Sequence, residues 1–186
     1  MRQRLQQLNL QLPQPLLVIS GKVQKDVRNM KQVQIYTDGA CTGNPGKGGY
    51  GAVLIYGENE KRISAGYRLT TNNRMELLAA VSALELLKTE CRVTLYSDSK
   101  YLTDAINKGW IDSWKKNGWV KSDKKKVLNT DLWKRLDALF QKHSVSLVWV
   151  KGHNGNEYNE ICDEMAVAAY NGDDLLTDDI YETGEK

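Results

Sequence analysis

Two short segments, Ile35-Tyr36-Thr37-Asp38 and Leu95-Tyr96-Ser97-Asp98, share one layout and decide the fold. In each, apolar residues alternate along a strand-like run that ends in an aspartate followed by a turn or helix signal. If the two strands are parallel neighbours, their aspartates lie side by side at the carboxyl ends, where open α/β sheets place ligand sites. Because adjacent carboxylates repel each other, this pattern predicts a cation between Asp38 and Asp98.

The remaining pattern predicts an α/β fold with a mixed five-stranded sheet and helices on both faces. Three strands come first, and strands then alternate with helices. We expect strands at residues 32–38, 50–56, 61–69, 92–97 and 145–150, and helices at residues 73–88, 99–107, 111–117, 129–142 and 157–171. A glycine-rich stretch, Gly39–Gly49, precedes a strand rather than a helix, so it is not a nucleotide-binding loop. It predicts either a wide hairpin loop or backbone that approaches a sugar–phosphate chain closely.

Both ends of the chain differ in composition from the middle. Residues 1–30 carry five basic side chains and one acidic, with five glutamines in the first 14 positions, so we expect an unstructured extension. Met30 is an alternative start of translation. Residues 172–186 carry six acids and one lysine without periodicity, and disorder is predicted there too. These limits leave residues 31–171 as one folded domain.

Cysteine usage and hydropathy restrict the class of protein. The three cysteines, Cys41, Cys91 and Cys162, are scattered and odd in number, which argues against a disulfide framework or a zinc site. A reducing cytosol suits them, so we expect a cytoplasmic protein. No apolar run approaches the ~20 residues that a membrane-spanning helix needs.

A basic cluster occupies residues 108–126, where seven lysines face only two aspartates. Such a cluster indicates a polyanionic partner. A solvated lysine-rich loop is the ordinary alternative and remains open.

Three further residues are candidates for the site of the two aspartates. Glu76 lies among small apolar residues on one helix face, but it could also be the third residue of a capping box that begins at Asn73. Asp163 lies one turn into a helix, where an acid commonly complements the helix dipole. His153 follows a strand between two glycines, and it is either a polar surface residue or a proton shuttle beside a metal cluster.

Four groups of motifs occur in order and resemble the bacterial-type ribonuclease H family, ribonuclease HI. They are YTDGAC (36–41) with GNPG (43–46), TTNNRMEL (70–77), SDSKY (97–101), and VKGHNG (150–155) with NEICD (159–163). The resemblance covers roughly residues 31–171. It implies an endonuclease that hydrolyses the RNA strand of RNA–DNA hybrids and leaves 5′-phosphate and 3′-hydroxyl ends.

The resemblance also implies a catalytic set and its cofactor. The metal ligands of the family fall on Asp38, Glu76, Asp98 and Asp163, and the loop histidine falls on His153. Four acids suit two Mg²⁺ ions, which Mn²⁺ can replace, since hard cations take oxygen ligands. His153 would assist proton transfer or product departure.

Residues for each strand of the hybrid follow from the same resemblance. The RNA strand would lie along Cys41, Asn44, Asn72 and Asn73. The DNA strand would meet Thr71, Trp110, Lys115, Lys116, Trp119 and Asn129. Two positions depart from the family pattern, with Leu69 where arginine is common and Lys100 where glutamine is common. The family also implies a monomer, and no protein partner or membrane association is expected.

Two other functions compete with this interpretation. A binding module of the same fold would hold hybrids without cutting them, but concentrated acids would then only repel phosphate. A DNA junction resolvase or integrase core would also use an acidic cluster. The pair Asn72-Asn73 and the basic segment argue against that alternative.

Overall fold

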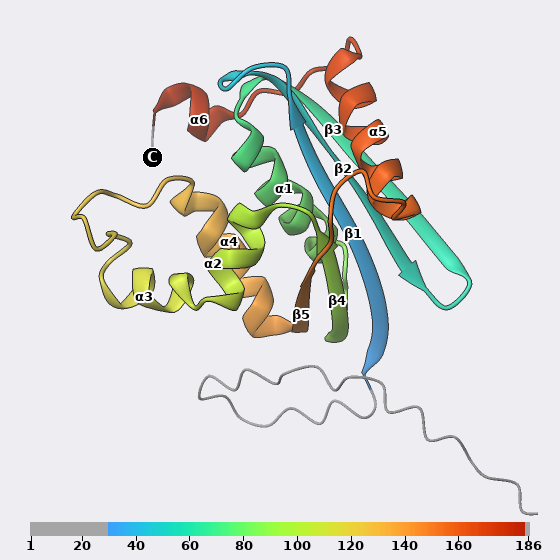
Figure 1. Cartoon of the computed structure of the whole chain (residues 1–186), viewed down its shortest axis with the longest axis horizontal. Coiled ribbons are helices and arrows are strands. Elements are labelled where there is room, and N and C mark those ends of the chain that lie inside the picture. The colour runs from blue at the N-terminus through green and yellow to red at the C-terminus, as the bar shows by residue number, and fades with distance from the viewer. Residues whose placement is uncertain (1–29, 185–186) are drawn as a thin grey trace, which may run out of the picture.

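The computed structural model describes residues 30–184, and it contains one five-stranded sheet flanked by helices (Figure 1). The strands are β1 (Lys31–Cys41), β2 (Gly46–Tyr56), β3 (Asn59–Thr70), β4 (Cys91–Ser97) and β5 (Ser144–Trp149). The helices are α1 (Asn72–Glu85), α2 (Lys100–Asn107), α3 (Trp110–Lys116), α4 (Thr130–Lys142), α5 (Glu157–Asn171) and α6 (Asp179–Thr183). The predicted α/β fold with a mixed sheet is therefore confirmed.

The sheet has the order β3-β2-β1-β4-β5. The first three strands form an antiparallel meander, while β4 is parallel to β1 and β5 is parallel to β4. Ile35 pairs with Leu95 and Thr37 with Ser97, so the two matched segments run side by side in register. Consequently both strands deliver their aspartates to the same edge of the sheet.

Helices cover both faces of the sheet, as predicted. Helices α1, α2 and α4 lie on one side and α5 on the other (Figure 1). The larger core, formed by the sheet with α1 and α4, contains fully buried apolar side chains such as Ile35, Leu95 and Trp133. On the opposite face α5 packs directly on β2, because a Cβ at Gly51 would collide with the backbone oxygen of Cys162.

The glycine-rich stretch is not a wide loop, which corrects the prediction. Strand β1 continues to Cys41 and β2 begins at Gly46, so residues 42–45 alone make the turn. Thr42 N donates to Lys47 O at 2.8 Å and closes the hairpin. Small residues form strands here because helices press on both faces of the sheet, a tertiary effect that local propensity does not encode.

The acidic tail is ordered up to residue 184, so the prediction of disorder was wrong for that part. Leu176 forms a β-bridge with Tyr67, and helix α6 follows. Asp178 is buried, accepting hydrogen bonds from Arg74 Nε at 2.6 Å and from Thr70 Oγ1 at 3.0 Å. A buried arginine needs such a carboxylate partner, and the pair of Arg74 with Asp178 holds the tail in place although the tail has few apolar side chains.

The expected unstructured extension at residues 1–30 lies outside residues 30–184, apart from its last residue, and stays a prediction. The alternative start at Met30 also stays a prediction. Within the part of the chain that the structure describes, no helix is long and apolar enough to cross a membrane.

Candidate active site and metal centre

Asp38 and Asp98 meet at the carboxyl ends of β1 and β4. Asp38 is buried, and its Oδ1 accepts a hydrogen bond from Gly39 N at 2.7 Å. Asp98 is partly exposed, and its backbone oxygen accepts from Trp149 Nε1 at 3.0 Å. The two parallel strands therefore hold two acids in place, as their matched sequences predict.

Glu76 joins them from the first turns of α1. Gly39 permits this approach, because a Cβ there would collide with the backbone nitrogen of Glu76. Carboxylate oxygens of Asp38, Glu76 and Asp98 lie within 4.8 Å of one another. The N-cap of α1 is Thr71, whose Oγ1 accepts from Arg74 N at 3.4 Å, so the capping box predicted from Asn73 is wrong. Glu76 points into the acid cluster instead.

The charges in this cluster are not balanced by the protein. Burial, followed by the neighbouring charges of Asp98 and Asp163, raises the pKa of Asp38 to about 8, although the hydrogen bond from the Gly39 N–H lowers it. Burial, followed by the charges of Asp38 and Asp98, raises the pKa of Glu76 well above its ordinary value. In addition, Glu76 Oε2 is buried without a hydrogen-bond partner among residues 30–184. Buried oxygens that repel one another are the donor set a hard divalent cation requires.

Asp163 lies on α5, on the other face of the sheet, and His153 lies on the loop that precedes this helix. Asp163 is partly exposed on α5, and its charge acts on Asp38, although it is not one of the three acids that lie within 4.8 Å. His153 is exposed on the loop between β5 and α5. Gly155 N donates to Glu160 Oε1 at 3.1 Å and ties this loop to α5.

The residues expected along an RNA strand gather beside α1. Asn44, in the β1–β2 turn, accepts a hydrogen bond from Asn72 N at 3.3 Å through its Oδ1. Asn73 is exposed in the same turn of the helix. Cys41 is partly buried at the end of β1, with its Sγ 3.7 Å from Thr70 O. A turn and a helix N-terminus thus form one polar surface next to the acids.

Two helix N-termini lie together near the expected DNA strand. The N-cap residue of α1 is Thr71, and that of α4 is Asn129, whose side chain makes no capping hydrogen bond. The ion pair between Arg74 and Asp131, at 2.9 Å, joins the two helices at these ends. Helix N-termini attract anions, so their juxtaposition favours a phosphate at this point.

The basic segment around α3 projects away from the sheet (Figure 1). Trp110 is 38% exposed, whereas Trp114 packs edge-on against buried Trp133 with a centroid separation of 5.5 Å. Lys115 is paired with an acid of α4, and Lys116 is exposed. Trp114 therefore serves helix packing.

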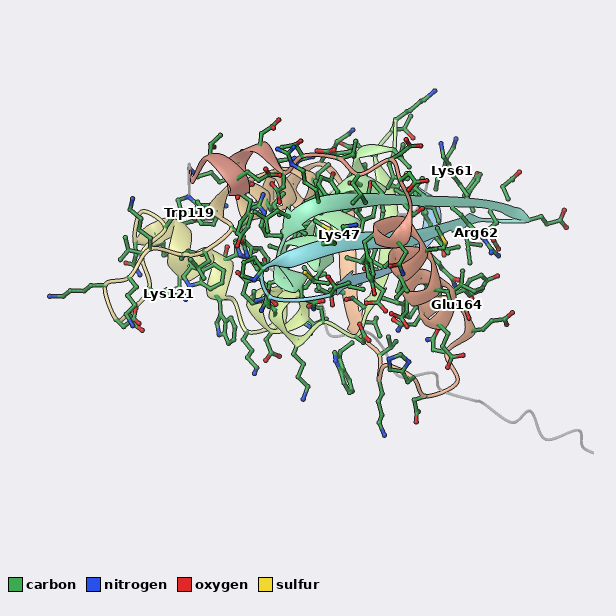
Figure 2. All side chains as sticks on the ribbon, turned by 90° about the horizontal axis from the view of Figure 1, so that it is seen from above. Lys47, Lys61, Arg62, Trp119, Lys121 and Glu164 are labelled. Carbon is green, nitrogen blue, oxygen red and sulfur yellow. The ribbon has the colours of Figure 1, made fainter. Side chains whose placement is uncertain are left out.

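Trp119 is half-buried and contributes to the same projection. The ammonium group of Lys134 lies over its ring, 5.8 Å from the centroid. Figure 2 places Trp119 and Lys121 at the opposite end of the molecule from Lys61 and Arg62. The projection is consequently a separate basic surface rather than part of one uniformly charged face.

Asn159 belongs to the site and has no role in the sequence interpretation. It is 2% exposed, and its Nδ2 donates to Asp98 Oδ2 at 3.4 Å. From the sequence alone, the position of Asn159 in the first turn of a helix indicates at most a role in capping that helix. Burial against an aspartate 61 positions away is visible only in the folded structure.

Comparisons with known proteins agree with this geometry. The chain matches the ribonuclease H family, RNase H, over residues 30–171. It is 59% identical to a ribonuclease H of Syntrophus aciditrophicus over 151 residues, which is 81% of this chain and 87% of that protein. It is 62% identical to a ribonuclease H of Pectobacterium carotovorum subsp. carotovorum over 139 residues, which is 75% of this chain and 90% of that protein.

Solved structures share the fold. LC9-RNase H1, described as a type 1 RNase H with the type 2 active-site motif, has a TM-score of 0.70 at 27% identity, covering 84% of this chain and 82% of that chain. LC11-RNase H1, solved in complex with an RNA/DNA hybrid, has a TM-score of 0.56 at 24% identity. That similarity covers 75% of this chain and 96% of that chain.

Proposed function

The chain belongs to the ribonuclease H family and is a nuclease, and we propose that it hydrolyses the RNA strand of RNA–DNA hybrids by two-metal-ion catalysis, leaving 5′-phosphate and 3′-hydroxyl ends. One observation carries the proposal. Three carboxylates on three separate elements, Asp38, Glu76 and Asp98, bring their oxygens within 4.8 Å of one another. A protein that only bound hybrids would gain nothing from this concentration of negative charge against phosphate.

The donor set supports Mg²⁺, with Mn²⁺ as a substitute. Asp38, Glu76 and Asp98 would hold the ions, and Asp163 would complete the site from α5. All are oxygen donors, and the unpartnered Glu76 Oε2 and the raised pKa values of Asp38 and Glu76 favour a cation. Ions bound there supply an activated water for attack on the phosphorus and stabilise the departing 3′-oxygen.

The residues of the chain prepare this site before substrate arrives. The Gly39 N–H and the α1 backbone fix two carboxylates at the sheet edge, so that little rearrangement is needed on ion binding. We assign proton transfer or product departure to His153, because it is exposed on the loop that follows β5.

Hybrid recognition would use the two surfaces on either side of the acids. Cys41, Asn44, Asn72 and Asn73 would contact the RNA strand, which differs from DNA by its 2′-hydroxyls. Thr71, Asn129 and the basic segment with Trp110, Lys115, Lys116 and Trp119 would contact the DNA strand. Phosphates would be attracted by the paired helix N-termini and by lysine charge.

Leu69 stands where arginine is common in the family, so we assign the binding of a DNA phosphate to these helix N-termini. Arg68, one position earlier, does not replace the missing arginine, because its guanidinium is engaged by Glu182 at 2.7 Å. Lys100 is exposed at the start of α2, 5.6 Å from the centroid of the Trp149 ring, and we assign it an additional phosphate contact. We further propose that the protein acts as a cytoplasmic monomer.

Asp38→Asn tests the assignment. We expect cleavage of a labelled hybrid in Mg²⁺ to be abolished while the fold is kept, because asparagine can still accept the Gly39 N–H bond but carries no charge for an ion. Glu164→Gln, on the exposed side of α5, is the matched control and should cut at the wild-type rate. Full activity in Asp38→Asn would refute the proposal.

A further inference from the structure

We propose that Asn159 is a positioning residue, which orients the Asp98 carboxylate for divalent-ion binding. The inference rests on the proposed metal centre and adds to it a residue that is not itself a ligand. It starts from a difference among the three clustered acids. Asp38 is held by a short hydrogen bond from its neighbour Gly39, and Glu76 is buried against the sheet edge. Asp98 is more exposed than either.

The Asp98 carboxylate is enclosed by the segment that links β5 to α5. Asn159 Nδ2 lies 3.4 Å from Asp98 Oδ2. Gly152 lies against the same oxygen, since a Cβ at that position would collide with it. Trp149 Nε1 meanwhile holds the Asp98 backbone oxygen at 3.0 Å. Side chain and backbone of this one aspartate are therefore both fixed from the same stretch of chain.

Asn159 is itself rigidly placed. It is the third residue of α5, and its backbone N–H is accepted by Oδ1 of the N-cap Asn156 at 3.2 Å. The side chain is 2% exposed and has little freedom to turn away. A rigid amide directed at a ligand carboxylate is the usual way in which a protein fixes the orientation of a metal ligand.

Filling space alone does not account for an asparagine here. Its Oδ1 is buried and has no hydrogen-bond partner among residues 30–184. Leaving such an acceptor unpaired is destabilising, and a leucine of similar volume would avoid that cost. The side-chain amide is therefore explained by its Nδ2 donor, which reaches the Asp98 carboxylate.

Asn159→Leu tests this assignment with a readout that does not depend on cleavage. Mg²⁺ binding to the full chain would be measured by calorimetric titration. We expect the affinity of Asn159→Leu to fall about 10- to 100-fold, as for other losses of a hydrogen bond to a metal ligand. The matched control is Asn171→Leu, the same substitution at the exposed last residue of the same helix, which should keep the wild-type affinity.

Cleavage kinetics separate positioning from a structural role. For Asn159→Leu, the Mg²⁺ concentration at half-maximal rate should rise by a similar factor, and saturating Mg²⁺ should restore much of kcat with KM for the hybrid unchanged. Unchanged Mg²⁺ affinity with only a lower melting temperature would overturn the inference. If the leucine variant does not fold, Asn159→Ser takes its place, because its hydroxyl is too short to reach Asp98. A wild-type chain that neither binds Mg²⁺ nor cuts would refute the proposed function as well.

Discussion

In metal-free solution, Asp38→Asn should make the protein more stable while removing its activity. Burial beside other carboxylates raises the pKa of Asp38 from its ordinary 3.8 to about 8. The folded state therefore binds this proton more tightly than the unfolded state does, and the free energy of unfolding falls as the pH rises from about 4 to about 8. Asparagine carries no such proton, so its stability should not fall in this way.

The size of the effect follows from the pKa difference. At pH 7 the carboxyl is about three pH units above its ordinary pKa, which at ~1.4 kcal/mol per unit sets an upper limit of about 4 kcal/mol. Water that enters the partly open cluster makes the effect smaller than this limit, so we expect Asp38→Asn to raise the free energy of unfolding by about 1–3 kcal/mol. For a domain of this size the gain corresponds to a rise in Tm of roughly 3–10 °C.

The assay is urea or thermal unfolding of both chains in EDTA between pH 4 and pH 8. The difference in stability should be close to zero at pH 4 and should grow toward pH 8. Glu164→Gln, which removes an exposed carboxylate, should show no such trend. Adding Mg²⁺ should stabilise the wild-type chain more than the variant, because a ligand stabilises the state that binds it. A variant that is less stable than wild type at pH 7, or a difference independent of pH, would refute the electrostatic argument.

Three other changes test separate parts of the account. Asp178→Ala leaves the buried Arg74 with one partner fewer, so the free energy of unfolding measured in urea should fall by about 3–5 kcal/mol. A fall below ~1 kcal/mol would mean that the tail is not needed for stability. Lys116→Ala should reduce the slope of log affinity against log salt concentration for a hybrid by about 1. Lys115→Ala should change this slope less, because Lys115 is already paired with an acid. Equal effects of the two substitutions would contradict this assignment. Gly39→Ala should inactivate the enzyme, since the added methyl group meets the α1 backbone, and normal cleavage would show that α1 can move without loss.

Much of the fold could be predicted because its determinants are local. The matched segments ending in Asp38 and Asp98 alternate as strands do, and parallel pairing places their acids together. Helix α5 was predicted with the bounds observed, since its periodicity and the glycine after it are strong signals. The position of Glu76 could be predicted only through the resemblance to a family, because its spacing fits a helix cap equally well.

The features that the sequence did not reveal depend on contacts between distant residues. Asp178 looks like one acid among several, and its burial depends on Arg74, 104 positions away. Glycines of the β1–β2 hairpin form strands because helices press on them from both sides. Asn159 likewise acquires its role from Asp98. Local pattern carries no information on such pairs, whereas the folded structure presents them directly.

Cleavage of one sequence in four forms decides among the three candidate functions: an RNA–DNA hybrid, an RNA duplex, a DNA duplex and single-stranded RNA, each with Mg²⁺ and with EDTA. We expect Mg²⁺-dependent cutting confined to the RNA of the hybrid, with 5′-phosphate and 3′-hydroxyl ends. Hybrid that is bound but left uncut would contradict it and favour a binding module. Cutting of the DNA duplex with the hybrid left intact would instead favour a nuclease of the resolvase type.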